Sequence, residues 1–309
     1  MKRGAVMTQK DPFFKKLWKN MRSHPLLYIM ILPVLAYFLV YHYYPMYGMI
    51  ISLFDYVPTK GVFGSDFVGL KHFKAFLGDP YFFRTMRNTV SINLLLLLFG
   101  FPFPIIFAIL LNELTGTRLR KITQTITYMP HFISAVVICG LMLDFCKTNG
   151  VITSVFTAIT GQEASNMFSH SAYFQPLYVL MCIWQEFGWD SIIYFAALTG
   201  IDQSLYEAAE IDNASAWAKF RYITLPSLKP ILIFVFITIT IGAFKMVVQP
   251  MVMTGGGPSY STYTLVYDIY QTGTVNWEIG TASAMSIVFA IFVIILTIIQ
   301  NKITKDKEE

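Results

Sequence analysis

Long apolar segments alternate with short polar segments along most of the chain. The apolar segments cover approximately residues 26–44, 88–111, 125–145, 173–198, 230–253 and 282–300. A helix needs about 20 apolar residues to cross roughly 30 Å of hydrocarbon. The pattern therefore predicts an all-α membrane protein with six transmembrane helices.

Composition supports this fold class. Of the 309 residues, 55% are hydrophobic and 13% are charged, and the mean hydropathy is +0.54. These values exclude an ordinary soluble domain. Aromatic residues reach 16%, which suits membrane interfaces, helix packing or a sugar-accepting cavity, and composition does not separate these uses. The cysteines Cys139, Cys146 and Cys182 lack metal-ligand spacing, so packing is the simplest interpretation.

The basic residues predict the topology. Residues 1–24 carry seven basic residues against one acid, and aromatic and apolar residues alternate with lysines there at helical spacing. We expect a cytoplasmic amphipathic segment over 1–24, followed by a first span that is retained rather than removed as a signal peptide, because there is no small-residue cleavage site. With that end inside, the inner segments hold 16 of the 23 basic residues, which places both termini in the cytoplasm. Residues 25–301 would then form one six-span domain, with a cytoplasmic loop at 199–229 and a cytoplasmic tail at 302–309.

The loop between the fourth and fifth spans has its own pattern. Ser204 and Glu207 have the spacing of a capping box, so a short helix is expected to begin there. Asn213 accepts the left-handed conformation that ends a helix, and Leu225-Pro226 is expected to break the helical run that follows. The sequence predicts helix, turn and helix.

This loop resembles the EAA loop of permease subunits of binding-protein-dependent ABC importers. Glu207-Ala208-Ala209 opens the pattern and Ile223-x-Leu225-Pro226 closes it at the family's spacing, with Asn213 where the family has glycine. The resemblance implies a type I, maltose-permease-like fold and a coupling helix that enters a cleft on a separate ATPase subunit. It assigns that contact to Glu207, Ala208, Ala209, Asp212 and Asn213. The alternative is an ordinary amphipathic connector.

Further motifs resemble the di- and oligosaccharide importer permeases within this family. They are Gly69-Leu70-x-x-Phe73, Asn88-Thr89, Tyr128-Met129-Pro130-His131-Phe132, and Met253-Thr254-Gly255-Gly256-Gly257-Pro258 followed by a tyrosine-rich segment. The glycines could suggest a phosphate-binding loop, but no Gly-Lys-Ser/Thr follows them, so we expect a helix end and a turn. Pro102 and Pro104 are expected to bend the second span.

The fourth span is the most polar. Trp184, Gln185, Glu186, Trp189 and Asp190 lie near its centre and should face protein or water rather than lipid. Carboxylates accept hydroxyl bonds and indole rings stack on sugar rings, so these residues are candidates for the substrate path. Lys245 and Gln249 of the fifth span join them as candidates. Helix packing is the alternative, with the acids paired to Lys245 or to a partner subunit.

His131 could be a proton-relay group or a ligand. A single histidine with no partner evident from the sequence favours a structural hydrogen-bonding role, and we assign it no chemistry.

The resemblance implies a permease subunit of the bacterial cell membrane that imports a carbohydrate, expected to be an oligosaccharide. The implied partners are a second permease, an ATPase dimer, an extracytoplasmic solute-binding protein, the sugar and the bilayer, with no nucleic acid. The chain lacks a Walker A sequence, so no cofactor is expected in it and ATP and Mg²⁺ belong to the ATPase. Alternatives are a permease for a non-sugar solute, a secondary transporter using Glu186, Asp190 and Lys245, and an intramembrane enzyme. No repeat supports the secondary transporter, and no nucleophile–base pair or metal cluster supports the enzyme.

Overall fold

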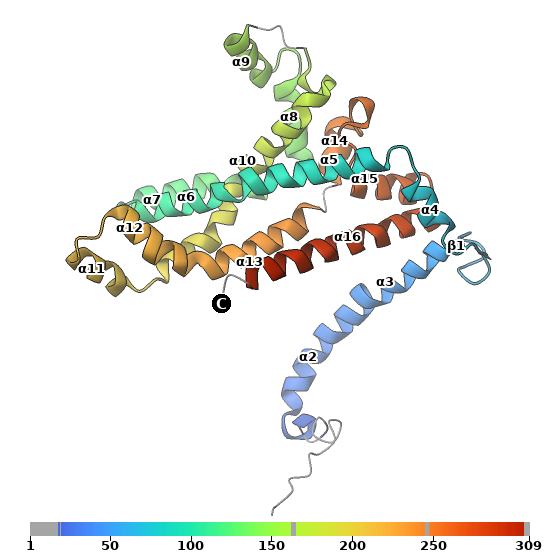
Figure 1. Ribbon diagram of the computed structural model, residues 1–309, viewed down its shortest axis with the longest axis horizontal. Helices are drawn as coiled ribbons and strands as arrows, with labels where there is room; N and C mark the ends of the chain where they lie inside the picture. The colour runs from blue at the N-terminus through green and yellow to red at the C-terminus, as the bar shows by residue number, and fades with distance from the viewer. Residues whose placement is uncertain (1–17, 19, 162–164, 245–246, 306–309) are drawn as a thin grey trace, which may run out of the picture.

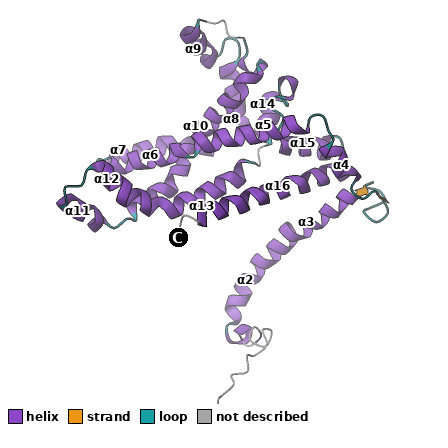
Figure 2. Ribbon diagram, in the orientation of Figure 1, coloured by secondary structure: helices purple, strands orange, loops and turns teal. Residues whose placement is uncertain are grey.

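The computed structural model describes residues 18, 20–161, 165–244 and 247–305, and this part of the chain is mainly helical (Figure 1, Figure 2). The strands described, β1 (Phe54–Asp55) and β2 (Asp66–Phe67), form one short antiparallel pair in which Phe54 faces Phe67. The longer helices are α2 (Pro25–Phe38), α5 (Phe82–Leu95), α6 (Pro102–Glu113), α7 (Thr117–Tyr128), α8 (Ala135–Cys146), α9 (Val151–Thr160), α10 (Ser171–Thr199), α13 (Leu225–Ala243) and α16 (Ile279–Lys305). The short helical segments are α3 (Tyr44–Met46), α4 (Lys71–Leu77), α11 (Gln203–Ile211), α12 (Ala216–Lys219), α14 (Val248–Thr254) and α15 (Leu265–Tyr270), with 3₁₀ turns η2 (Tyr47–Leu53), η4 (Met129–Phe132), η5 (Met167–Ser169) and η7 (Pro258–Tyr260) and π-helical turns η1 (Leu39–Tyr43), η3 (Leu96–Gly100), η6 (Phe220–Thr224) and η8 (Gln271–Val275).

The first span stands away from the body of the molecule (Figure 1). Helical structure runs from Pro25 to Leu53, beyond the predicted end at residue 44, and α2 buries none of its residues. Its side chains are nearly all apolar, so this helix needs lipid or another subunit around it.

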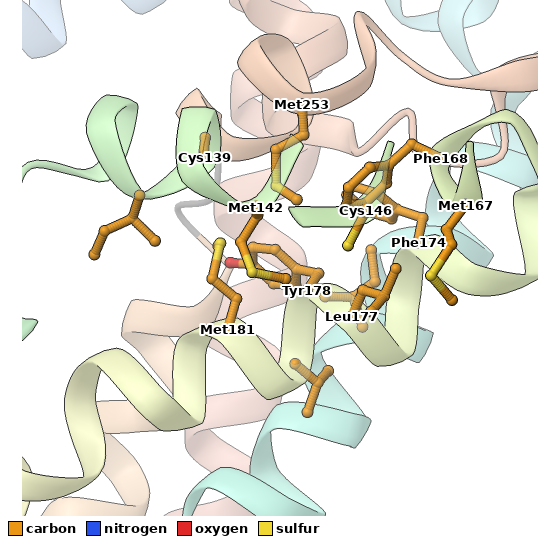
Figure 3. Packing of buried hydrophobic residues seen from close by; sticks show 13 residues of the cluster. Cys139, Met142, Cys146, Met167, Phe168, Phe174, Leu177, Tyr178, Met181 and Met253 are labelled. Carbon is orange, nitrogen blue, oxygen red and sulfur yellow. The ribbon is translucent and has the colours of Figure 1, made fainter. Parts of the chain in front are cut away.

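The body is built around α10. One core cluster joins α10 to α6 and α13 through the buried residues Ala108, Tyr194, Leu198, Leu228 and Val235. A second joins the first half of α10 to α8 and α14. Figure 3 shows this cluster, in which methionine and cysteine side chains meet the rings of Phe168, Phe174 and Tyr178. The three cysteines are free, and Cys139 and Cys146 are fully buried in this cluster, as expected for packing residues.

Three π-helical turns each precede a proline in the first turn of the next helix. The turns η1, η3 and η6 come directly before the helices that contain Pro45, Pro102 and Pro226. A proline has no N–H and its ring collides with the carbonyl four residues earlier. In each case that carbonyl lies in the widened turn, which lets the helix continue.

The prediction that Leu225-Pro226 breaks the helical run was therefore wrong. One helix continues from Ala216 to Gly242, because the π-helical turn at Phe220–Thr224 accommodates Pro226.

The predicted third span is not one helix. Thr117–Phe132 and Ala135–Cys146 meet at an angle of 96°. Ile133 and Ser134 have extended backbones, and the Ser134 hydroxyl accepts a hydrogen bond from the Val137 N–H and so caps α8. A capping serine after Pro130 starts a new helix rather than extending the old one.

The predicted fifth span is also divided. α13 ends at Ala243, and α14 is a separate helix that packs against α8. Val247 before α14 has a non-helical backbone, and Pro250, which has no N–H to donate, lies in the first turn of α14.

Among the residues that the structure describes, four helices are long and apolar enough to cross a membrane, or up to five if the bent pair counts as one span. α10 has 29 residues but carries the polar residues Gln185, Glu186 and Asp190 in its middle. The structure thus confirms an all-α chain rich in apolar helices, while the count of six spans stays a prediction.

Candidate functional site

The loop after α10 folds into two short helices whose first residues are capped by side chains. α11 begins after Asp202, whose carboxylate accepts a hydrogen bond from the Ser204 N–H at 3.0 Å. The expected Ser204–Glu207 capping box was wrong, because Asp202 provides the cap two residues earlier. This hydrogen bond also lowers the pKa of Asp202. α12 begins after Ser215, whose hydroxyl accepts from the Ala218 N–H at 3.2 Å.

Asn213 ends α11 in the left-handed conformation, as predicted, with φ of 54°. The Ala214 N–H donates to the Ala209 carbonyl at 2.9 Å, and the Asn213 N–H donates to the Glu210 carbonyl at 3.0 Å. Together these two bonds form a Schellman motif. The turn between α11 and α12 therefore has a defined backbone.

Two side-chain contacts hold the loop against itself and against the turn η6 that leads into α13. Glu210 of α11 pairs with Lys219 of α12 at 2.7 Å, and hydrogen bonding to this lysine lowers the pKa of Glu210. The Tyr206 hydroxyl lies 2.8 Å from the Thr224 hydroxyl at the start of the fifth span. Movement of α11 is thus linked directly to a membrane helix.

The loop presents its motif residues outward. Glu207, Ala208, Asp212 and Asn213 are exposed, and Ala209 is half-buried. Large apolar side chains beside them are also exposed, with Ile211 at 81% and Trp217 at 67%. Exposed apolar side chains grouped on one polar loop are typical of a protein–protein contact surface.

A cavity of about 710 Å³ lies on the other side of the loop. Its walls come from the end of α6, from Arg120 of α7, and from α11 and α12. The cavity separates part of the loop from the body, so the loop is attached to the body through its two ends and through the Tyr206 contact.

The polar centre of α10 contains an acid–histidine pair. The His131 Nδ1 lies 2.6 Å from a Glu186 carboxylate oxygen, and the His131 ring stacks on Trp189 with parallel planes and centroids 4.3 Å apart. Phe132 meets the same indole edge-on. The structure gives His131 the hydrogen-bonding partner that could not be identified from the sequence, because Glu186 lies 55 residues away.

A cavity of about 310 Å³ opens on the neighbouring face of α10. Glu186 and Asp190 both line it, opposite Leu96 and Gly100 before α6 and opposite Ile239 and Gly242 of α13. Two carboxylates in a mainly apolar cavity between helices form a site that can accept hydrogen bonds from hydroxyl groups.

The lining of this cavity does not include the other predicted substrate-path residues that the structure describes, namely Trp184, Gln185, Trp189 and Gln249. Gln185 is buried and donates to the Ile133 carbonyl at the break before α8. Trp184 is 47% exposed on the surface of α10. Gln249 lies on α14, and Lys245 lies outside the described residues.

The chain is similar to permease proteins over nearly its whole length. The model of the binding-protein-dependent transport system inner membrane component matches residues 100–308. YteP, the polygalacturonan/rhamnogalacturonan transport system permease protein of Bacillus subtilis (strain 168), is 35% identical over 97% of this chain and 94% of YteP. AraP, the arabinooligosaccharides transport system permease protein of Halalkalibacterium halodurans, is 29% identical over 97% of this chain and 93% of AraP.

A solved structure has the same fold. It is the bacterial alginate ABC transporter in complex with an alginate pentasaccharide-bound periplasmic protein, and it matches with a TM-score of 0.82 and 31% identity over 94% of this chain and 98% of that chain. Together with the capped α11–α12 loop and the polar centre of α10, these similarities establish that the chain belongs to the family of binding-protein-dependent transport system inner membrane components.

Proposed function

We propose that this chain is one of two permease subunits of an ATP-driven importer, and that the complex moves an oligosaccharide delivered by an extracytoplasmic binding protein. The observation that carries the proposal is the exposed, doubly capped α11–α12 loop, which presents Glu207, Ala208 and Asp212 away from the body. The names of YteP and AraP and the alginate complex support a carbohydrate cargo.

In this proposal α11 is the coupling helix and docks on an ATPase subunit through Glu207, Ala208, Ala209, Asp212 and Asn213. ATP and Mg²⁺ bind to the ATPase dimer, and this chain holds no cofactor. Closure of the ATPase pair pulls on α11, and the Tyr206–Thr224 contact passes that movement to α13. The spans then rock as rigid bodies between inward-facing and outward-facing states.

The proposal places the loop and both chain ends on the cytoplasmic side of a bacterial membrane. Basic residues concentrate in these segments, and α16 ends toward the same side of the body as α11 (Figure 1). Residues 25–301 then form the permease domain, and residues 199–229 its coupling loop.

We place the sugar against the cavity at the centre of α10. Glu186 and Asp190 accept hydrogen bonds from sugar hydroxyls, while the His131 contact fixes the Glu186 carboxylate in position. Trp189 packs against His131 and Phe132 beside this cavity, and this packing supports the orientation of the His131–Glu186 pair. Trp184 and Gln249 do not line this cavity and would serve other stages of the path.

Reconstitution tests the proposal. The chain would be co-purified with its native partners, inserted in liposomes, and supplied with binding protein and labelled galacturonate or arabinose oligosaccharides. ATP-dependent uptake of one of these sugars is expected. Uptake that continues without ATP or without the ATPase would contradict the proposal and favour a secondary transporter.

A further inference from the structure

Four tyrosines form a row at the end of the molecule opposite the α11–α12 loop. The ring centroids of Tyr81 and Tyr260 are 5.2 Å apart, those of Tyr260 and Tyr263 are 5.5 Å apart, and those of Tyr263 and Tyr267 are 4.9 Å apart. Tyr81 lies at the start of α5, Tyr260 and Tyr263 lie between α14 and α15, and Tyr267 lies in α15; these segments lie together in Figure 1. The row thus joins two parts of the chain about 180 residues apart.

The row runs from the surface into the protein. Tyr81 and Tyr260 are each about half exposed, Tyr263 is partly buried, and Tyr267 is 3% exposed. The Tyr267 hydroxyl at the inner end accepts a hydrogen bond from Gln271 at 2.9 Å. The outer two rings therefore keep free surface that packing inside the chain does not use.

The backbone of the row is fixed in place by α5. The Asn88 amide donates to the carbonyls of Tyr260 and Tyr263 at 3.0 and 3.2 Å, and the Thr89 hydroxyl accepts from the Leu265 N–H at 2.8 Å. Asn88 and Thr89 are buried, so these bonds are shielded from water.

Tyr260 has an unusual backbone. Its φ is 57°, in the left-handed region that bulky residues rarely adopt. Such strain persists where surrounding bonds hold it, and it concentrates at binding sites. A loop that only needed to turn here would be better served by glycine, as at Gly255, Gly256 and Gly257 just before it.

A cation lies beside the outer ring. The Arg84 guanidinium is 5.5 Å from the centroid of the Tyr81 ring. The outer end of the row therefore combines aromatic faces with a guanidinium group, and the Asp79 carboxylate accepts a hydrogen bond from the Tyr81 N–H at 2.6 Å beside them. Hydroxyl-rich rings with apolar faces match these aromatic faces and polar groups.

We propose that Tyr81 and Tyr260 form a stacking subsite for one pyranose ring of the oligosaccharide, at the entrance of the path and distinct from the Glu186–Asp190 cavity. This inference rests on the proposed function. Sugar released from the binding protein stacks first on Tyr260. The partly buried Tyr263 and the buried Tyr267 support the exposed pair from below.

Binding of trigalacturonate and arabinotriose to the purified complex, measured without ATP by saturation-transfer NMR and titration, tests the subsite. Tyr260→Gly removes the ring and accepts the backbone conformation without strain. We expect its affinity for trigalacturonate to fall about 3- to 10-fold, which is the range of one aromatic contact. Tyr260→Phe keeps the ring and should bind as the wild type does. Tyr270→Ala, a change at an exposed tyrosine on the adjacent α15, is the matched control and should also be unchanged.

Equal affinity of Tyr260→Gly and the wild type, or no binding by the wild type, would overturn the subsite. Uptake in liposomes is scored separately. If the complex takes up sugar but Tyr260→Gly and the wild type bind trigalacturonate equally, only the subsite is rejected. If binding depends on the Tyr260 ring but uptake does not depend on ATP, only the proposed importer is rejected.

Discussion

Asn213 holds the end of α11 in a backbone conformation that few side chains accept. Asn213→Gly should leave the stability of the turn unchanged or slightly raise it, whereas Asn213→Ala should destabilise the turn by about 1 kcal/mol. Hydrogen exchange at the amides of 212–214 would show this as about fivefold faster exchange in the alanine variant only. Similar exchange in both variants would mean that the Schellman turn does not depend on Asn213.

Asp268 predicts a pH dependence. Burial raises its pKa from 3.8 to about 6, and the nearby Asp79 carboxylate adds to the shift. Because the folded-state pKa is raised, the contribution to stability is complete below pH 3.8 and is lost as the pH rises through about 6. The Asp268→Asn variant lacks this pH-dependent loss of stability. The melting temperature of the variant should therefore exceed that of the wild type at pH 7.5, and the two melting temperatures should be similar at pH 4. An equal difference at both pH values would contradict the assignment.

At the scale of elements, α7 and α10 touch through Gly188. A Cβ placed there would lie 2.1 Å from the Thr127 carbonyl oxygen, which is backbone and cannot rotate away. Gly188→Ala should therefore separate the two helices and cost about 1–3 kcal/mol. Gly140 of α8 has open space around it, so Gly140→Ala is the matched control and should be neutral or stabilising. Equal melting temperatures of the two variants would argue against this contact.

The positions of the helices were predictable where apolar runs were uninterrupted, as in α5–α6 and α16. The breaks between helices were not predictable, because each depends on which of several local backbone conformations the residues adopt. Pro226 could break a helix or be absorbed by a π-helical turn, and only the structure shows the second outcome. Ser134 looked like a residue inside a span but serves as a cap.

At the scale of the whole molecule, the helix–turn–helix form of the loop after α10 was predictable from local spacing, since its residues are close together in the chain. Its role in coupling came from the family resemblance and stays a prediction. The α10 site was predicted only in part. Glu186 and Asp190 share a cavity as their spacing suggests, but the His131–Glu186 pair and the tyrosine row join distant segments. Contacts over such separations leave no periodic signal in one sequence.

The central claim is that α11 docks on an ATPase, and co-purification of the ATPase with Ala208→Trp tests it most directly. Ala208 is exposed, so the bulky ring should leave the chain folded while filling the space the partner needs. Ala172→Trp, at an exposed alanine in the first turn of α10, is the control. We predict that the wild type and Ala172→Trp retain the ATPase and that Ala208→Trp loses it with an unchanged melting temperature. Full retention of the ATPase by Ala208→Trp would contradict the account.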